Sequence, residues 1–210
     1  MTERHYLHSD KLEMHASVVS CSPAEDGTYQ IVLSATLFHP QGGGQPSDLG
    51  TIADAKVIRV SQAGDDVIHH CDRSVAAGDV DIKVSAEPRA LHARLHSAGH
   101  LISYCGEPFG WRAVKGHHWP GEARVIFEAE DGAPAFTADA IEQQANAQIA
   151  SDAARHVSQE GETRKVGFGH LPAYPCGGTH VASLGIVGRV RILKVKEKKG
   201  QLWVHYDVES

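Results

Sequence analysis

The stretch Leu95-His96-Ser97-Ala98-Gly99-His100-Leu101 decides how the second half of this chain folds. It lies in a segment, Pro88 to about Tyr104, whose apolar residues recur at helical spacing and predict an amphipathic helix. On a helical wheel the apolar members fall within about 60° of one another, and the polar members share a neighbouring face. One side should pack against a core and the other should display histidines, up to a break near Gly106-Glu107-Pro108. The apolar members are Leu91, Leu95, Ala98 and Ile102, and the polar ones are His92, His96, His100 and Ser103.

A second motif, Cys176-Gly177-Gly178-Thr179-His180, offers two metal-type ligands at the same spacing. Residues four apart on a helix share a face, so His96 and His100 can bind one ion. The two glycines of the second motif predict a tight turn, in which a thiolate and an imidazole can converge. One cysteine with three histidines suits tetrahedral Zn²⁺, which can also stabilise a fold. The sequence therefore predicts a zinc site with the ligands His96, His100, Cys176 and His180.

The other histidines, from a total of 15, give weaker indications. His92 lies one turn before His96, and we expect it to be a neighbour of the site rather than a ligand. His117 and His118 stay open, because their glycine-flanked loop could bring them to the metal. Surface positions are expected for His69 and His70 on a strand, and for His5, His8 and His15 near the N-terminus.

Two common site motifs are absent. The residue after His96 is Ser97, so the glutamate base of HExxH metalloproteases is missing. The glycine-rich stretch Gly42-Gly43-Gly44-Gln45 lacks the Lys-Ser/Thr ending of a phosphate-binding loop. By composition alone it is a flexible β-turn after a strand that ends near Phe38.

Residues 1–85 predict a β-rich domain that contains this GGGQ loop. Alternating strand patterns occupy residues 29–34, 56–60 and 80–84, and turns rich in glycine and aspartate separate them. Short strands with such turns are typical of a small barrel or a sandwich.

Residues 86–210 predict a second domain, which mixes helices and strands. A strand is expected over residues 123–128, and Thr137 is a candidate N-cap for a helix that ends near Gly161. Residues 187–196 and 202–208 predict a hairpin, with Gly200 supplying a positive φ in the turn. The expected fold class of the whole chain is α+β.

Composition narrows the setting. The 210 residues contain no apolar run long enough to span a membrane, and the first residues lack the apolar core of a signal peptide. The four cysteines show no CxxC motif and no disulfide framework, which favours a reducing compartment. We therefore expect a cytoplasmic protein that does not contact the membrane.

Charge is divided unevenly along the chain. The formal net charge of −6 lies within residues 1–85, and residues 86–210 are balanced. The segment Arg189 to Lys199 holds six cations and the single acid Glu197, and such a run could face a phosphate backbone. Taken alone, it is better explained as a solvated hairpin, since charged strand edges also prevent aggregation.

Taken together, these motifs resemble a known family. HSAGH, CGGTH and the segment GGGQPSD (Gly42 to Asp48) look like the editing domain of alanyl-tRNA synthetase, and more specifically like the free-standing AlaX trans-editing proteins. Residues 115–120, KGHHWP, are similar to a KGYHFP-like segment common in AlaX proteins. The resemblance covers nearly the whole chain, including the basic hairpin from Gly188 to Val208. It implies a small N-terminal β-barrel followed by a two-layer α/β zinc-binding domain, similar to the editing domains of alanyl- and threonyl-tRNA synthetases.

The resemblance also implies an activity. Such proteins hydrolyse the ester that joins a wrong amino acid, serine or sometimes glycine, to the 3′ end of tRNA(Ala), without ATP. It implies that His96, His100, Cys176 and His180 hold Zn²⁺. It suggests that Gly43, Gly44, Gln45, Lys115 and Thr179 contact the substrate. The protein should act as a monomer.

One residue departs from the synthetase pattern. The synthetase motif usually has threonine directly before its second histidine, and this chain has Gly99. A hydroxyl that could contact a seryl substrate is thus missing, and the preference between serine and glycine stays open.

Other functions also remain open. Alanine and serine differ by one hydroxyl, which an apolar pocket rejects only about 10²-fold, so a second hydrolytic site is chemically reasonable. Zinc could activate water or orient the substrate, and no acidic residue stands out as a general base. The alternatives are an RNA-binding module with a purely structural zinc, and an unrelated zinc hydrolase for small esters.

Overall fold

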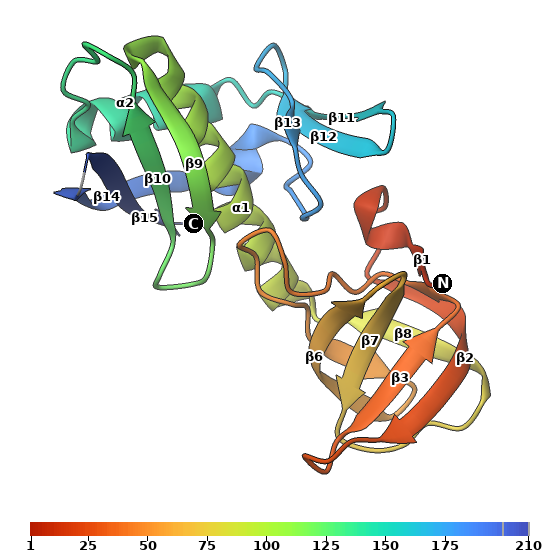
Figure 1. Ribbon diagram of the computed structural model, residues 1–210. Coiled ribbons are helices and arrows are strands. Elements are labelled where there is room, and N and C mark those ends of the chain that lie inside the picture. The colour runs from red at the N-terminus through yellow and green to blue at the C-terminus, as the bar shows by residue number, and fades with distance from the viewer. Residues whose placement is uncertain (199, 210) are drawn as a thin grey trace. The chain divides into compact units, whose positions relative to one another are not determined.

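The computed structural model describes residues 1–198 and 200–209 (Figure 1). Lys199, which belongs to the basic run and to the last predicted turn, lies outside the described residues. The described chain is mostly β-strand with two α-helices, which confirms the α+β class. It divides into two compact units, residues 1–42 with 46–90 and residues 43–45 with 91–210. Neither α-helix of the described residues has the length and apolar character that a membrane span requires.

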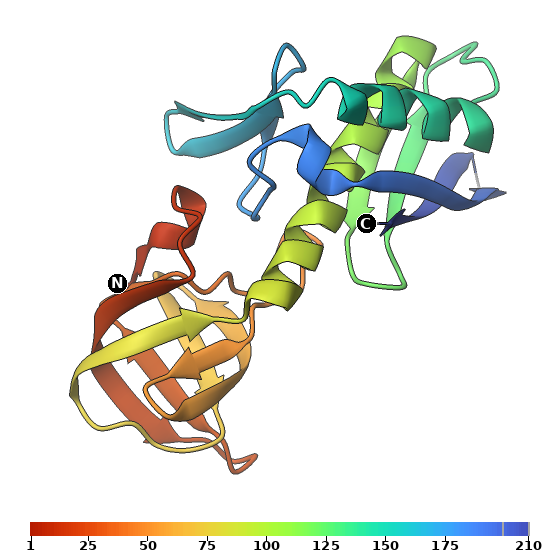
Figure 2. The same cartoon turned by 180° about the vertical axis from the view of Figure 1, so that it is seen from behind.

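Six strands of the first unit form a closed barrel. Its neighbouring strands are all antiparallel, and residues such as Ile31, Leu33 and Val57 are completely buried inside it. A short parallel pair and the 3₁₀ helix η1 (His5–Leu7) complete the unit, whose main strands are labelled in Figure 1 and seen from behind in Figure 2. Around the barrel the order is β2 (Glu13–Pro23), β3 (Tyr29–Leu33), β7 (Asp66–Cys71), β6 (Ala55–Ala63), β5 (Gly50–Ile52) and β8 (Gly78–Val84), and the parallel pair is β1 (Glu3–Arg4) with β4 (Ala35–Thr36).

The expected surface positions of His69 and His70 are wrong. Their exposed fractions are 0% and 7%. His69 Nε2 lies 2.8 Å from the Thr36 hydroxyl and its Nδ1 lies 3.0 Å from the Ile31 carbonyl oxygen, so both ring nitrogens have partners. Burial lowers the pKa of His69 to about 4. The other three are as expected in part: His8 and His15 are exposed, and His5 is partly exposed.

The second unit is built around helix α1 (Ala86–Gly106), which begins in the first unit and continues into the second. Its apolar stripe packs in one core with the inner face of a four-stranded antiparallel sheet and with helix α2 (Ala138–Ala150). Leu95, Leu101, Phe127 and Val204 are all completely buried there. The sheet order is β14 (Arg189–Lys198), β15 (Gln201–Glu209), β10 (Arg124–Ala129) and β9 (Trp111–His117), and the 3₁₀ helices η2 (Glu107–Phe109) and η3 (Leu184–Val187) flank it in sequence.

Helix α2 begins as predicted but ends early. The Thr137 hydroxyl accepts a hydrogen bond from the Ala140 N–H at 3.3 Å, which confirms the N-cap. The expected end near Gly161 is wrong, because the helix stops at Ala150 and the chain turns through Asp152 at φ 46°. A three-stranded antiparallel sheet follows, formed by β11 (Arg155–Glu160), β12 (Thr163–Phe168) and β13 (Tyr174–Pro175). Residues 155–160 are mostly polar and exposed, so their sequence predicts no strand.

Candidate metal centre

The two ligand motifs meet in the second unit. His96 and His100 come from consecutive turns of α1, and Cys176 and His180 come from the turn that follows β13. Each residue contributes one ligand atom to a cluster in which all four atoms lie within 4.8 Å of one another. The Cys176 Sγ lies 3.5 Å from His96 Nε2 and 3.1 Å from His180 Nε2. The sequence motifs thus form one four-residue constellation.

This cluster fits a metal ion of the zinc type. Zinc bonds to nitrogen and sulfur place the ligand atoms of a tetrahedron about 3.3–3.6 Å apart, close to the two sulfur–nitrogen distances here. His100 Nδ1 is buried and has no hydrogen-bond partner among the described residues. A set of three imidazoles and one thiol also matches the ligand preference of Zn²⁺.

The expected exposure of the histidine face of α1 is wrong. His92, His96 and His100 are 7%, 3% and 8% exposed. Tyr174 on β13 meets the His100 ring edge to face at 5.7 Å, and the His180 ring lies 4.4 Å from the rings of both His96 and His100. The helical wheel identified the face correctly, but the segment that covers it lies about 75 residues further along the chain. His92 is outside the four-residue cluster, as expected.

Gln45 from the glycine-rich loop fixes the orientation of His96. Its Oε1 accepts hydrogen bonds from His96 Nδ1 at 2.7 Å and from the Thr179 N–H at 3.0 Å. Its Nε2 donates to the Thr179 hydroxyl at 2.8 Å. With Nδ1 protonated and bonded to Gln45, His96 presents its Nε2 lone pair to the cluster. Gln45 is completely buried.

The Cys176–His180 turn is held by a second set of contacts. The Ser97 hydroxyl lies 3.1 Å from His180 Nδ1 and accepts from the Val181 N–H at 3.2 Å, so His180 Nε2 is left for the metal. Arg164 Nη1 donates to the carbonyl oxygens of Cys176 and Gly178 at 2.6 and 3.2 Å. Arg155 Nη1 donates to the His180 carbonyl oxygen at 2.6 Å, so strands β11 and β12 both stabilise the turn that carries two candidate ligands.

Burial sets the protonation states of the ligands. It lowers the pKa of His100 to about 4, with a smaller contribution from Arg164, and it lowers the pKa of His180 well below the ordinary value. Both imidazoles are therefore neutral near pH 7 and can donate a lone pair. Burial raises the pKa of the Cys176 thiol, and the Gly178 N–H and Arg164 oppose that rise. A bound cation would favour the thiolate.

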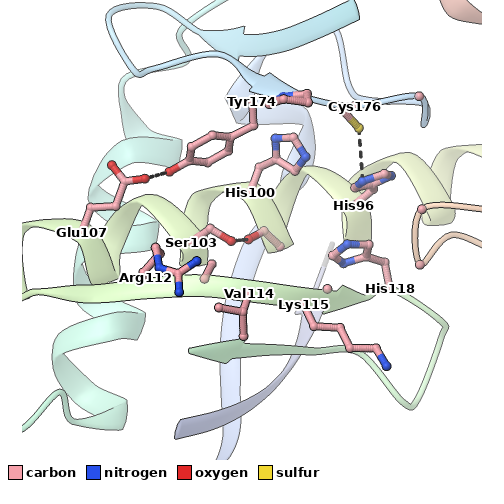
Figure 3. Close-up of a pocket in the computed structure, with 17 residues that line it drawn as sticks. His96, His100, Ser103, Glu107, Arg112, Val114, Lys115, His118, Tyr174 and Cys176 are labelled. Carbon is pink, nitrogen blue, oxygen red and sulfur yellow. Dashed lines mark hydrogen bonds between the residues drawn. The ribbon is translucent and has the colours of Figure 1, made fainter. Parts of the chain in front are cut away.

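A pocket of about 580 Å³ opens beside the cluster. Figure 3 shows His96, Cys176 and His118 together at one end of it. Tyr174, Glu107 and Ser103 lie toward the other end, where the Tyr174 hydroxyl donates to the Glu107 carboxylate and Ser103 donates to the Gly99 carbonyl oxygen. The pocket therefore joins the metal-type ligands to a wall of hydrogen-bonding side chains.

Of the five residues predicted to contact the substrate, three line the pocket and two do not. Gly43, Gly44 and Lys115 line the pocket. Gln45 and Thr179 do not line it; they are buried behind His96 and bond to each other. Their placement is that of supports for the ligand set.

The two histidines left open by the sequence separate clearly. His118 is buried at the pocket and stacks on His96 with ring centres 4.4 Å apart. Burial lowers the pKa of His118 to about 3, with smaller contributions from His100 and His117. His117 instead stacks on Trp119 and lies 3.6 Å from Glu122.

Sequence reasoning missed Ser97, Arg164, Tyr174 and Glu107. Ser97 was visible only as the residue that excludes an HExxH motif, and its bond to His180 joins residues 83 positions apart. Arg164 lies in a strand that the sequence does not predict. Tyr174 directly precedes Pro175, and its closeness to the second motif was the one available signal.

Comparisons with known proteins agree with this geometry. Residues 155–203 match the family described as the threonyl and alanyl tRNA synthetase second additional domain. The chain is 32% identical over 225 residues to the alanyl-tRNA editing protein Aarsd1 of Mus musculus. The aligned region covers 89% of this chain and 53% of the relative. The chain is a relative of the alanyl-tRNA editing proteins. The resemblance to the AlaX family is thereby confirmed.

Other relatives extend this relationship. Alanyl-tRNA editing protein Aarsd1-B of Xenopus laevis is 28% identical over 224 residues, covering 89% of this chain and 53% of the relative. An alanine–tRNA ligase of Methanobrevibacter smithii is 28% identical over 215 residues, covering 82% of this chain and 23% of the ligase. The chain spans about half the length of the alanyl-tRNA editing proteins that it matches.

Proposed function

We propose that this protein is a zinc-dependent hydrolase that removes a wrong amino acid from tRNA(Ala), serine first and glycine second. The observation that supports this most directly is the Cys/His₃ cluster beside a pocket, in a chain related to alanyl-tRNA editing proteins. We also propose that it acts as a monomer in the cytoplasm.

The four ligands His96, His100, Cys176 and His180 would hold the Zn²⁺. When bound, Zn²⁺ supplies Lewis-acid polarisation at the ester or a fixed point for the amino group of the substrate. Gln45 holds His96 in the tautomer that exposes Nε2, and the Ser97 hydroxyl contacts His180 Nδ1, so that the His180 Nε2 faces the cluster. Since no carboxylate lies in the ligand cluster, we expect the terminal ribose hydroxyl of the tRNA to assist its own deacylation.

The cations on the outer face of the four-stranded sheet favour an RNA partner. Lys196, Trp203, Ile126 and Lys115 lie opposite one another in register across the four strands. The next row in register is Lys194, His205, Arg124 and His117. Residues in register point to the same side of a sheet, and those two apart along a strand do so as well. We name Lys115, Arg124, Lys194 and Lys196 the basic sheet face.

Like charges crowd on the basic sheet face. The neighbouring Lys194 lowers the pKa of Lys196. Burial lowers the pKa of His205, and Arg124, Lys196 and Lys194 lower it further. A phosphate backbone would relieve that repulsion. Lys115 also lines the pocket, so the basic sheet face extends to the candidate site.

A second candidate is an RNA-binding module in which zinc is purely structural. It is favoured by the number of protein ligands, because four of them complete a tetrahedron and leave no open position. In that case the protein would bind tRNA without releasing an amino acid.

One assay tests both candidates. Zinc-loaded protein is incubated separately with seryl-, glycyl- and alanyl-tRNA(Ala), and release of the amino acid is followed over time. We expect rapid release of serine, slower release of glycine and little release of alanine. Binding of tRNA(Ala) without turnover would support the structural-zinc module. Equal hydrolysis of small amino-acid esters would indicate a general esterase.

A further inference from the structure

The imidazole of His118 lies in a slot made by three glycines, Gly44, Gly99 and Gly116. A Cβ at Gly99 would lie 2.4 Å from His118 Cε1, and one at Gly116 would lie 2.5 Å from Nε2. A Cβ at Gly44 would lie 3.2 Å from Cδ2. Real Cβ atoms do not approach other atoms as closely as the first two distances. The glycine slot is therefore shaped around this ring.

Tyr206 fixes which nitrogen of His118 carries the proton. The Tyr206 hydroxyl donates its only hydrogen to the Leu95 carbonyl oxygen at 2.9 Å. The same oxygen lies 2.7 Å from His118 Nδ1, so it must accept the Nδ1–H. Neutral His118 then has an unprotonated Nε2, which is a hydrogen-bond acceptor. Gly99 also makes room for this hydroxyl, since a Cβ there would lie 2.8 Å from Tyr206 Oη.

The Nε2 acceptor has no task in the metal centre. His118 lies outside the four-residue cluster, although its ring stacks on His96 at 4.4 Å. No hydrogen bond among the described residues uses His118 Nε2, while the side chain lines the pocket. Figure 3 shows the ring at the pocket end that holds His96 and Cys176. A fixed acceptor thus lies beside the candidate reaction centre.

We propose that His118 Nε2 accepts a hydrogen bond from the side-chain hydroxyl of a seryl substrate, and that His118 is the residue that selects serine in this chain. The inference rests on the proposed deacylation. It explains Gly99: a threonine there could not coexist with the His118 ring, and the imidazole supplies the polar contact instead. A site that hydrogen-bonds a substrate hydroxyl discriminates far better than an apolar pocket.

The test compares His118→Ala with the wild type on seryl-, glycyl- and alanyl-tRNA(Ala). Loss of the acceptor leaves the seryl hydroxyl unpaired, and we expect kcat/KM for seryl-tRNA(Ala) to fall about ten- to hundredfold. Glycine and alanine carry no hydroxyl, so their values should change less than about twofold. An equal fall for all three substrates, or no fall for any, would overturn the proposal.

A second variant covers the case in which His118→Ala fails to fold, as judged by zinc content and circular dichroism. Tyr206→Phe keeps both rings but removes the oxygen that holds the proton on Nδ1. The kcat/KM for seryl-tRNA(Ala) should fall severalfold, and the values for glycyl- and alanyl-tRNA(Ala) should not. An unchanged ratio of the seryl value to the glycyl value would overturn the proposal. The matched control is His117→Ala, the adjacent histidine that stacks on Trp119, which should leave the ratio as in the wild type.

The result also separates this inference from the function on which it rests. A wild type that releases neither serine nor glycine would refute the deacylase itself. If the wild type releases serine preferentially and the His118 and Tyr206 variants keep that preference, the deacylase function is supported and the role of His118 in selecting serine is refuted.

Discussion

At the scale of single residues, the four candidate ligands are held in place by side chains that lie outside their cluster. Gln45 is separated from His96 by 51 positions and from Thr179 by 134, yet its amide bonds to both. Such partners fix the tautomer and the orientation of a ligating histidine, and their loss typically costs 10- to 100-fold in metal affinity. The glycine-rich loop therefore helps to hold the candidate metal cluster.

Replacing Gln45 should weaken metal binding without removing a ligand. In Gln45→Ala, His96 Nδ1 loses its acceptor, and we expect the zinc affinity to fall about 10- to 100-fold. Competition with a chromophoric chelator measures the affinity. The exposed Gln41 on the same loop gives the control, since Gln41→Ala should keep the wild-type affinity. Equal affinities for Gln45→Ala and wild type would contradict the supporting role.

The pH dependence of barrel stability should reflect His69. The pKa of His69 is about 4 in the folded state and 6.5 ordinarily, so between these pH values His69 is protonated in the unfolded chain and neutral in the folded barrel. The stability of the first unit should therefore fall as the pH drops from about 6.5 to 4, by up to about 3 kcal/mol. Hydrogen exchange of β3 and β7 at several pH values measures it. His69→Asn should flatten this dependence and the exposed His15→Asn should not; a steep dependence that survives His69→Asn would refute the assignment.

The four residues of the candidate metal cluster could be singled out from the sequence, but most of their environment could not. Spacing by four residues is a local property, and it identified His96, His100, Cys176 and His180. The roles of His118, Ser97 and Gln45 depend on contacts between residues 51 to 88 positions apart, which no local pattern encodes. The burial of His69 was missed for the same reason. Its partners, the Thr36 hydroxyl and the Ile31 carbonyl oxygen, lie more than 30 positions away, and the residue pattern of one strand does not reveal them.

At the scale of elements, prediction succeeded where apolar periodicity was strong. The helix around HSAGH, the N-cap at Thr137 and the final hairpin were all expected and are present. Strand β11 was missed because its exposed, mostly polar residues lack a core-facing pattern, and in β12 only the last residues, from Val166 to Phe168, are buried. Tertiary contacts through Arg155 and Arg164 to the Cys176–His180 segment place them instead.

A buried ion pair connects the start of α1 to the segment after the glycine-rich loop. Arg89 Nε donates to the Asp48 carboxylate at 2.9 and 3.1 Å, and Asp48 also accepts from the His39 N–H at 2.6 Å. Asp48 is completely buried and Arg89 is 7% exposed. Asp48 thus has a structural role at the end of the GGGQPSD segment.

Breaking that pair should strongly destabilise the first unit. Asp48→Ala leaves the Arg89 guanidinium buried without its counter-charge, at an expected cost of about 3–5 kcal/mol. The double variant Asp48→Leu/Arg89→Met removes both charges and should cost less than the single one. Urea denaturation measures both, and the exposed Asp54→Ala provides a control with little effect. A double variant less stable than Asp48→Ala would contradict this account.

At the scale of the whole molecule, the two units should respond differently to metal removal. All four ligands and Gln45 belong to the second unit. Chelation should abolish deacylation and increase hydrogen exchange in α1 and in residues 174–181, while the exchange of barrel strands β2 and β3 stays unchanged. Zinc should restore both activity and protection. Activity that persists in verified metal-free protein would exclude the zinc-dependent mechanism.

The basic sheet face should determine the salt dependence of tRNA binding. Each cation that contacts phosphate contributes about 0.7–0.9 to the slope of log K against log salt. Lys194→Gln/Lys196→Gln should reduce the slope by about 1.4–1.8, measured by fluorescence anisotropy with labelled tRNA(Ala). The control, Lys11→Gln/Lys56→Gln, removes two exposed cations from the first unit and should leave the slope unchanged. An equal reduction in both variants would place the tRNA elsewhere.

The glycine slot has a consequence for how this sequence can evolve. A side chain at position 99 collides with the imidazole at position 118, so the two positions cannot change independently. A lineage that changes glycine to threonine at position 99 must first replace the histidine at position 118 by a smaller residue. A lineage that gains histidine at position 118 must first have glycine at position 99. The order of substitutions is thereby constrained, and each intermediate has neither polar group at the pocket. Selectivity for serine would have to be lost for a time before a different side chain could restore it.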